Sequence, residues 1–402
     1  MKADAVKKIC VVLVDRANYG RLRPVMTAIR QDPALVLQTV CAGTMMLERF
    51  GNAAGDLKAE GFDVDGCVFL EMEGSLPVTM AKGIGLGVLG FASEFHRLQP
   101  DVVLVIGDRS EALAAAIAAV YSNFCLAHIQ GGELSGSIDE SARHAITKLA
   151  HLHFPSTERA ARYIVQMGES PAHVFNVGCP SGDYILPLDD ALPAILSRGG
   201  DEENLSLDPA VPFFLVIFHP VTTQWETQRH QAEQLVQALH QLAQPTLWIS
   251  PNIDAGADSI AAVLHAYQKR HQPDWLQVVS NLDPVSYQKI LKRAACAIGN
   301  SSSFIRDSSF TGTPVVLIGD RQTGREHGPN VMTCAAEVGE ILGATRRQLA
   351  HGRYAASPLY GDGKASQRIV RILKSFVPYP QKRLHYDDDA GCDLRGRARV
   401  VG

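Results

Sequence analysis

Short runs of consecutive apolar residues alternate along the chain with longer stretches in which apolar residues recur every three or four positions. In the first half the short runs fall at residues 8–14, 35–41, 101–107, 124–129 and 173–178. Continuous apolar runs separated by helical stretches are typical of a parallel sheet that helices cover on both faces. We therefore expect a first doubly wound α/β domain over residues 1–185.

The same alternation begins again after a break in the middle of the chain. The apolar runs of the second half fall at residues 212–219, 245–250, 275–280, 296–300 and 314–319. Proline and acidic residues cluster in 187–212, which we interpret as an interdomain linker with a helix inside it. The pattern predicts a second domain of the same class over residues 186–364. Two such domains in series place a ligand cleft between the carboxyl ends of their sheets.

Composition and charge narrow the class of protein. Of the 402 residues 46% are hydrophobic and 20% are charged, and the formal net charge is −4, so we expect no nucleic-acid or membrane-surface partner. The start lacks the apolar core of a secretory signal, and no apolar run reaches the roughly 20 residues of a membrane-spanning helix. The eight cysteines form no CxxC pair. These features favour a reduced cytoplasmic protein without structural zinc, and we expect residues 382–402, which lack periodicity, to form a loosely ordered tail.

The segment Gly85–Gly90, GLGVLG, matches the G-x-G-x-x-G pattern of dinucleotide-binding loops. The residues before it, SLPVTMAK, do not form a convincing strand, so the strand–turn–helix context that this pattern requires is missing. We interpret these glycines as small residues that allow a helix to pack closely.

Candidate functional groups follow two strands of the first domain. Asp108 and Arg109 stand directly after one strand, where open α/β sheets place functional groups; the alternative is an Asp that only caps the next helix. Gly131 and Gly132 follow the next strand and allow the backbone to approach a ligand.

The helix after these glycines carries charges four residues apart. Its apolar face is expected to hold Ile138, Ala142, Ala145 and Leu149. Asp139 lies four residues before Arg143 on the remaining surface, so the two can meet, either as a surface ion pair or as functional groups. His151 and His153 alternate in a strand-like run and are interpreted as packing residues, because no set of His, Cys and Asp has metal-ligand spacing.

The second half offers an anion-binding site. The stretch GNSSS at 299–303 places three serines at the start of a helix, whose N-terminal amides and dipole favour phosphate; simple capping by serine is the alternative. Arg321 and Arg325 follow a later strand and suit either a diphosphate or surface charge. His219 and Asn252 also stand at strand ends.

Eight stretches resemble the UDP-N-acetylglucosamine 2-epimerase family, specifically its hydrolysing branch of the sialic-acid and legionaminic-acid pathways. They are RANYGRLRP, TMAKGIGLG, GDRSEALA, HIQGGELSGSIDESARHAITKLAHLHF, NVGCPSGD, FHPVTT, GNSSS and GDRQTGR, in order from Arg16 to Arg325. The resemblance implies a GT-B-like α/β fold of two Rossmann-like, doubly wound parallel-sheet domains that face a central cleft. It also implies a C-terminal helix around 365–380 that returns to the first domain, a homodimer or homotetramer, and no cofactor.

The resemblance assigns site residues position by position. Nucleotide and diphosphate contacts are implied at Arg16, Arg109, His219, Asn252, Ser301, Ser302 and Arg321. Sugar contacts are implied at Asp108, Asp139 and Arg143. Asp307 replaces the family's ribose-binding Glu. Three sugar-side positions depart from the family, with Asn18 for an Asp, Met45 for a His and Gln130 for a Glu.

These positions imply hydrolysing 2-epimerisation of a nucleotide-sugar. A UDP-N-acetylglucosamine-type donor would give UDP and a free N-acetylmannosamine-type sugar, through elimination to a glycal and hydration. Because a glutamine cannot act as a general base, we expect proton abstraction by Asp108, Asp139 or the nearby Glu133, while His219 helps the diphosphate to leave. The changed sugar-side positions indicate a donor other than plain N-acetylglucosamine.

Other functions stay open at this point. A 2,4-diacetamido-6-deoxy sugar linked to UDP or GDP would undergo the same reaction. A GT-B glycosyltransferase would need an acceptor, and non-hydrolysing epimerases usually carry HVEAGLR where this chain has HIQGGELSGSIDE. The three sugar-side departures also fit a protein that binds a nucleotide-sugar without turning it over.

Overall fold

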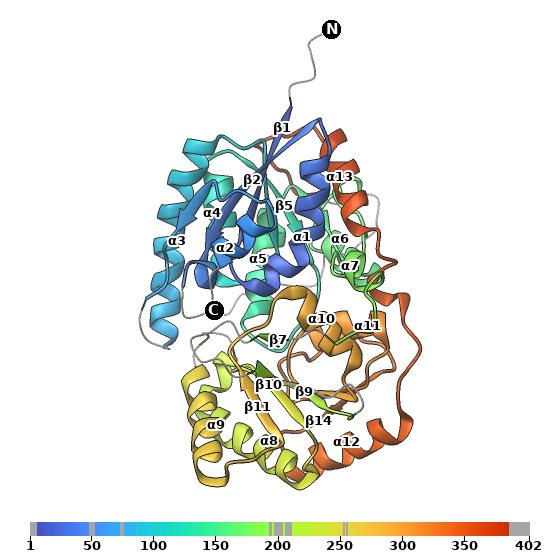
Figure 1. The fold of residues 1–402 in the computed structure, drawn as a ribbon. Helices are drawn as coiled ribbons and strands as arrows, with labels where there is room; N and C mark the ends of the chain where they lie inside the picture. The colour runs from blue at the N-terminus through green and yellow to red at the C-terminus, as the bar shows by residue number, and fades with distance from the viewer. Residues whose placement is uncertain are drawn as a thin grey trace, which may run out of the picture.

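The computed structural model describes residues 6–47, 53–72, 76–192, 195–196, 204–205, 211–251, 254 and 256–385. Two six-stranded parallel sheets, each flanked by helices, lie one above the other in Figure 1. This is the GT-B-like architecture of two Rossmann-like units. The continuous apolar runs of the sequence form the central strands of both sheets because a strand buried on both faces exposes no side chain to water.

The first sheet has the order β3-β2-β1-β4-β5-β6. Its strands are β1 Lys7–Leu13, β2 Leu35–Ala42, β3 Gly66–Val68, β4 Val102–Ile106, β5 Cys125–Ile129 and β6 Leu152–Phe154. The accompanying helices are α1 Arg16–Gln31, α2 Ala53–Ala59, α3 Pro77–Leu98, α4 Ser110–Tyr121, α5 Asp139–Leu149, α6 Glu158–Gln166 and α7 Gly182–Ile185, with short 3-10 turns η1 Gly43–Met46 and η3 Pro171–His173. The strand order reverses between β1 and β4, and ligands of doubly wound sheets bind beside such a reversal.

The second sheet repeats this topology in the order β11-β10-β9-β12-β13-β14. Its strands are β9 Phe214–Ile217, β10 Thr246–Ile249, β11 Leu276–Val279, β12 Cys296–Gly299, β13 Val315–Ile318 and β14 Val331–Cys334. The helices are α8 Gln228–Leu242, α9 Ala257–His271, α10 Pro284–Arg293, α11 Ser303–Thr311, α12 Val338–His351 and α13 Ala365–Ser375, with turns η4 Thr222–Thr227 and η5 Pro358–Tyr360. Here the order reverses between β9 and β12.

Three sequence-based predictions were wrong or incomplete. Residues 173–178 form no strand but the turn η3 and one isolated bridge between His153 and Val174. The described part of the linker holds no helix. It contains a short antiparallel pair of strands, β7 Ile195–Leu196 and β8 Asn204–Leu205. Strands β3 and β14 were not predicted, because edge strands of three or four residues leave too little apolar pattern.

The chain's last described helix packs on its first. Leu22 of α1 and Ile369 of α13 belong to one buried cluster, and the two helices lie side by side in Figure 1. The Lys7 ammonium donates to the carbonyl oxygen of Leu373 at 2.7 Å. This packing supports our proposal that α13 belongs to the first domain. A domain boundary near residue 186 is likewise our proposal.

The segment that follows α13 is ordered as far as the structure describes it. The ammonium of Lys382 lies 2.5 Å from the buried carboxylate of Glu169, and the amide of His385 donates to the carbonyl of Gly168 at 3.0 Å. The prediction of a loose tail beginning at residue 382 was therefore wrong for residues 382–385. Residues 386–402 lie outside the described part of the chain.

The GLGVLG segment lies inside α3, where its glycines allow close packing. A Cβ added at Gly87 would lie 2.9 Å from the Cβ of Ala114 in α4, and one added at Gly90 would lie 2.6 Å from Val68 in β3. Because real Cβ atoms do not approach so closely, larger residues would push α3 away from the sheet. The packing interpretation of this segment is confirmed.

Candidate functional site

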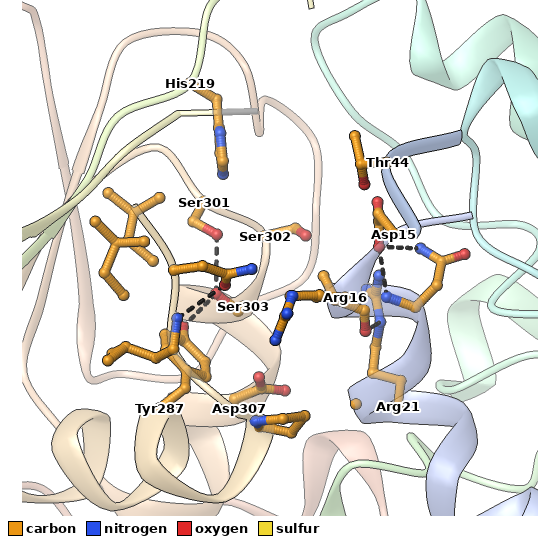
Figure 2. A pocket seen from close by; sticks show the side chains of 18 of the residues that line it. Asp15, Arg16, Arg21, Thr44, His219, Tyr287, Ser301, Ser302, Ser303 and Asp307 are labelled. Carbon is orange, nitrogen blue, oxygen red and sulfur yellow. Dashed lines mark hydrogen bonds between the residues drawn. The ribbon is translucent and has the colours of Figure 1, made fainter. Parts of the chain in front are cut away.

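A pocket of about 240 Å³ lies between the domains at the carboxyl ends of both sheets. The first domain lines it with Asp15, Arg16, Ala17, Asn18, Gly20, Arg21, Thr44, Asp108, Arg109, Asp139 and Tyr184. The second domain lines it with Ile217, His219, Ile249, Ser250, Pro251, Ser280, Asn281, Leu282, Pro284, Tyr287, Gln288, Ser301, Ser302, Ser303, Asp307 and Arg321. Figure 2 shows Arg16 and Arg21 on one side, facing the serines and Asp307 on the other.

Most residues singled out in the sequence meet in this pocket. They are Arg16, Asn18, Asp108, Arg109, Asp139, His219, Ser301, Ser302, Asp307 and Arg321. Met45, Gln130, Glu133 and Arg143 do not line it. Asn252 lies outside the described residues. Sequence reasoning missed Arg21, which falls within the quoted RANYGRLRP stretch, and Tyr287, which had no local signal.

The second-domain wall presents hydroxyl groups at the start of α11. Strand β12 ends at Gly299, whose backbone has φ +142 and where any Cβ would collide with the carbonyl oxygen of Ile217. The hydroxyl of Ser303 then contacts those of Ser301 and Tyr287 at 2.8 and 2.6 Å. Because the first amides of a helix have no partner within the helix and carry its positive dipole end, this wall suits an anion.

His219 stands at the end of β9 and is tied to β12. Its backbone amide donates to the side-chain oxygen of Asn300 at 2.7 Å, and the Asn300 amide donates back to the His219 carbonyl at 2.8 Å. Burial, with the nearby positive charge of Arg321, lowers the pKa of His219 to about 3. The imidazole is therefore neutral at physiological pH, so it can offer a ligand a hydrogen bond but no positive charge.

Arg109 is surrounded by carboxylates. Its guanidinium lies 2.6 Å from Asp254, 3.1 Å from Glu111 and 3.8 Å from Asp15. Asp254 comes from the second domain, so this ion pair crosses the cleft. These three carboxylates offset the positive charge of Arg109, a residue that the family resemblance assigns to diphosphate binding.

Two carboxylates face the pocket from the first domain, each held by a different arginine. Asp108 forms an ion pair with Arg143, which is completely buried. Asp139 lies 3.5 Å from Arg321 of the second domain and accepts a hydrogen bond from Ser137 at 2.9 Å. The predicted pair of Asp139 with Arg143 on one face of α5 is therefore not formed.

The orientation of α5 explains why Asp139 and Arg143 do not pair. Arg143, Ile146 and Thr147 are buried, whereas Ile138, expected on the apolar face, is 49% exposed. The guanidinium of Arg143 donates to the carbonyl of Glu133 at 2.7 Å in addition to its contact with Asp108. Because Arg143 is buried with these partners, the buried face of α5 is centred on Arg143 and Ile146 and not on the apolar face that the sequence predicted.

Glu133 is part of a buried ionic cluster behind the pocket. Its carboxylate lies 2.7 Å from Arg306 and 3.2 Å from Arg325, both of the second domain. Burial alone would raise the pKa of Glu133, but these two guanidinium groups lower it below its ordinary value. A carboxylate that is ionised, buried and outside the pocket lining is poorly placed as a general base, so we remove Glu133 from the acid/base candidates. Arg325 is likewise a buried partner rather than a surface charge or a pocket group.

Comparison with known proteins shows the family of this chain. A family profile described as UDP-N-acetylglucosamine 2-epimerase matches residues 27–374. The chain belongs to the UDP-N-acetylglucosamine 2-epimerase family.

Two curated relatives cover nearly the whole chain. The hydrolyzing UDP-N,N'-diacetylbacillosamine 2-epimerase of Legionella pneumophila is 33% identical over 376 residues, which cover 94% of this chain and 98% of that protein. A UDP-N-acetylglucosamine 2-epimerase of Neisseria meningitidis is 30% identical over 373 residues, which cover 92% of this chain and 96% of that protein.

A solved structure shares the fold. The UDP-N-acetylglucosamine 2-epimerase of Methanocaldococcus jannaschii, solved with UDP-GlcNAc and UDP, superposes with a TM-score of 0.74 at 15% identity, covering 91% of this chain and 99% of that one. In the part of the present chain that the structure describes, no group of three or more His, Cys, Asp or Glu side chains could hold a metal ion. No described helix is long and apolar enough to cross a membrane.

The positions where this epimerase-family chain departs from the family have different surroundings. Met45 is buried in the core of the first domain, whereas Asn18 lines the pocket and donates to Asp15 at 2.9 Å. Gln130 is completely buried, with φ +63, and its side chain contacts Arg21 and Cys179. Only Asn18 of these three can touch a ligand directly.

Asp307 holds the place of the family's ribose-binding Glu. It is 4% exposed and accepts hydrogen bonds from Ser181 at 2.8 Å and Gln288 at 2.7 Å. Burial raises its pKa above the ordinary value despite these two donors. The shorter acid is thus anchored from behind, with one side toward the pocket.

Proposed function

We propose that this protein is a hydrolysing nucleotide-sugar 2-epimerase, which converts a UDP-linked 2-acetamido sugar to UDP and the free 2-epimeric sugar. The observation that carries the proposal is one continuous pocket lined by both a helix start suited to phosphate, at Ser301–Ser303, and two carboxylates, Asp108 and Asp139. Diphosphate departure and proton transfer at the adjacent sugar carbon need these two sets of groups side by side.

The first step is loss of the diphosphate. The C2 proton of such a sugar is not next to a carbonyl, so its direct removal would be very slow. Cleavage of the C1–O bond sends the electron pair to the diphosphate oxygen and builds positive character at C1, which acidifies C2. Arg16, Arg321, the neutral imidazole of His219 and the amides at the start of α11 stabilise the departing group.

The second and third steps are proton removal and hydration. Asp108 or Asp139 takes the C2 proton, and the C–H electron pair forms the C1–C2 double bond of a glycal. Water then adds its hydroxyl to C1 while a proton returns to C2 on the opposite face, which inverts C2 and gives a free sugar. Closure of the two domains around the ligand keeps stray water from the first step.

Two donors are compatible with this reaction. Plain UDP-N-acetylglucosamine is the family's reference substrate, and the Neisseria relative carries that name. The Legionella relative, at 33% identity, and a Campylobacter jejuni relative, at 30%, are both named for N,N'-diacetylbacillosamine donors. These names favour a 2,4-diacetamido-6-deoxy sugar as the second candidate donor.

The test is phosphorus and proton NMR of the purified protein in D2O, with UDP-N-acetylglucosamine and then with UDP-N,N'-diacetylbacillosamine. The expected result is UDP plus a free sugar of inverted configuration that carries one deuterium at C2. A free sugar of unchanged configuration without deuterium would show simple glycoside hydrolysis. A nucleotide-linked epimer would show a non-hydrolysing epimerase.

Inertness of both donors would also be informative. Sugar transfer that requires an added acceptor would identify a glycosyltransferase. Binding without any product would identify a nucleotide-sugar binding protein. Either outcome would overturn the proposal.

A further inference from the structure

The arginines that line the pocket differ in the charge of their neighbours. Arg16 lies 3.0 Å from Asp56, and Arg321 lies 3.5 Å from Asp139. Arg109 has three carboxylates within 3.8 Å. Each of these guanidinium groups is at least partly balanced by an acid.

Arg21 is different. Its Nε donates to the carbonyl oxygen of Ala17 at 3.1 Å, and its Nη1 donates to the side-chain oxygen of Gln130 at 3.3 Å. Within the described part of the chain its hydrogen bonds go to neutral acceptors, and it forms no ion pair there. Arg21 is half-buried and lines the pocket, so it brings a positive charge that is not held in an ion pair by any described carboxylate, although the buried Glu133 and Asp307 lie within its field.

Arg21 also lies across the pocket from the second-domain wall. Figure 2 shows it on the α1 side of the pocket, across from Asp307 and Tyr287. Its charge acts on Asp307 and Tyr287 of the opposite wall, and on Tyr184 of α7. An anionic group bound against the serines of α11 would therefore lie within the field of Arg21.

Gln130 holds Arg21 without cancelling its charge. The glutamine is completely buried, its backbone is left-handed with φ +63, and its amide nitrogen donates to the sulfur of Cys179 at 3.1 Å. This second contact directs the amide oxygen toward Arg21. A carboxylate at the same place would accept the same hydrogen bond, but it would also form a buried ion pair and remove the positive charge from the pocket.

We propose that Arg21 binds the diphosphate of the nucleotide, and that Gln130 is a positioning residue that keeps the Arg21 guanidinium oriented and uncompensated. This assignment rests on the proposed function only in taking a nucleoside diphosphate as the ligand. It explains a departure from the family without invoking loss of activity, because a glutamine here strengthens the anion site. Arg21 and Gln130 thereby join Arg16 as first-domain contributors to the diphosphate site.

The experiment is isothermal titration calorimetry of the full chain with UDP and, separately, with uridine. Arg21→Gln is expected to weaken UDP binding about 10- to 100-fold, since a hydrogen-bonded contact between charged groups is lost. Uridine, which has no phosphate, should bind the variant and the unchanged protein alike. Arg21→Lys should retain part of the UDP affinity because it keeps the charge.

The matched control is Arg23→Gln, two residues further along α1. Arg23 pairs with Glu60 and does not line the pocket, so UDP affinity should change less than about twofold. Thermal melting of every variant checks that it folds. Should Arg21→Gln fail to fold, Arg21→Lys and the Gln130 variants carry the test.

Gln130→Glu tests the second half of the proposal. It is expected to weaken UDP about tenfold or more, with uridine unchanged, because the new carboxylate pairs with Arg21. Combined with Arg21→Gln it should cost much less than the two single losses added together, since there is no longer an arginine charge to cancel.

The outcomes separate the inference from the proposed function. An Arg21→Gln variant that binds UDP normally, or that loses UDP and uridine equally, would overturn the role of Arg21. Strictly additive losses in the double variant would overturn that of Gln130, and failure of the unchanged protein to bind UDP would overturn both. Arg21-dependent UDP binding in a protein that releases no sugar would instead refute the epimerase proposal alone.

Discussion

The two walls of the pocket are built from different chemistry. The wall from the first domain is densely charged, with three arginines and three carboxylates: Asp15, Arg16, Arg21, Asp108, Arg109 and Asp139. The wall from the second domain presents mainly hydroxyls, amides and a helix start, and the pKa of its histidine is lowered so far that the ring is neutral.

This difference suggests a division of labour. Hydroxyls and backbone amides hold a ligand whose charge persists through the reaction, at little electrostatic cost when the site is empty. Carboxylates can move protons, and here arginines hold them in place. We therefore expect the second-domain wall to govern nucleotide binding and the first-domain carboxylates to govern turnover, with Arg16 and Arg21 as first-domain arginines that also bind the nucleotide.

The largest effect is expected from the buried ionic cluster of Glu133, Arg306 and Arg325, which links the two domains. Glu133→Leu leaves Arg306 and Arg325 buried without their carboxylate, and removal of one partner from a buried ion pair typically costs about 3–5 kcal/mol. Urea denaturation should show this loss in the free energy of unfolding. The control Glu140→Gln weakens a half-exposed contact with His144 and keeps a side-chain oxygen that can accept from the Ser135 amide, so it should change stability by less than about 0.5 kcal/mol. Equal stability of both variants would mean that the cluster does not hold the domains together.

Asp108→Asn tests the turnover side of the division. We expect kcat to fall at least ~100-fold, because an amide cannot accept a proton, while UDP affinity changes little. Steady-state rates of UDP release and calorimetry with UDP measure the two quantities. Near-normal kcat would remove Asp108 from the mechanism, and Asp139→Asn would then identify the remaining carboxylate.

The third test concerns two buried histidines, of which His219 lines the pocket and His128 lies inside β5. His128, bonded to the Gly107 carbonyl at 2.8 Å, and His219 each have a pKa that burial lowers to about 3. The unfolded chain binds protons at these side chains near pH 6.5 and the folded chain does not, so stability decreases as pH falls below that value. The slope is about 1.4 kcal/mol per pH unit for each histidine.

Denaturation midpoints at pH 7.5, 6.5 and 5.5 measure this slope, and His219→Asn should reduce it. A stability that stays constant down to pH 5.5 would contradict the neutral state of both rings.

The smallest effect is expected on the hydroxyl wall. Ser301→Ala removes the hydrogen bond to Ser303 and one contact to a bound phosphate, worth about 1 kcal/mol, so KM should rise about fivefold with kcat nearly unchanged. Initial rates over a range of donor concentrations separate the two constants. A fall in kcat with KM unchanged would break the proposed division between the walls.

Local sequence was sufficient for the central architecture and for part of the site. The strands at the middle of each sheet are buried on both faces, so their continuous apolar runs identify them without knowledge of their neighbours. Asp108 and Ser301–Ser303 could be predicted for a similar reason, because they directly follow such strands. Edge strands β3 and β14 escaped prediction, since three or four residues with few buried side chains carry little pattern.

Only the tertiary structure decided which charges meet. Arg143 pairs with Asp108 rather than with Asp139, four residues away, because the fold buries it beneath the end of β4. Glu133 and Gln130 are only three positions apart in the sequence, yet their partners differ. Glu133 pairs with Arg306 of the other domain, whereas Gln130 accepts a hydrogen bond from Arg21. Electrostatic partners are set by proximity in space, and residues more than a hundred positions apart become neighbours only once both sheets have formed and docked.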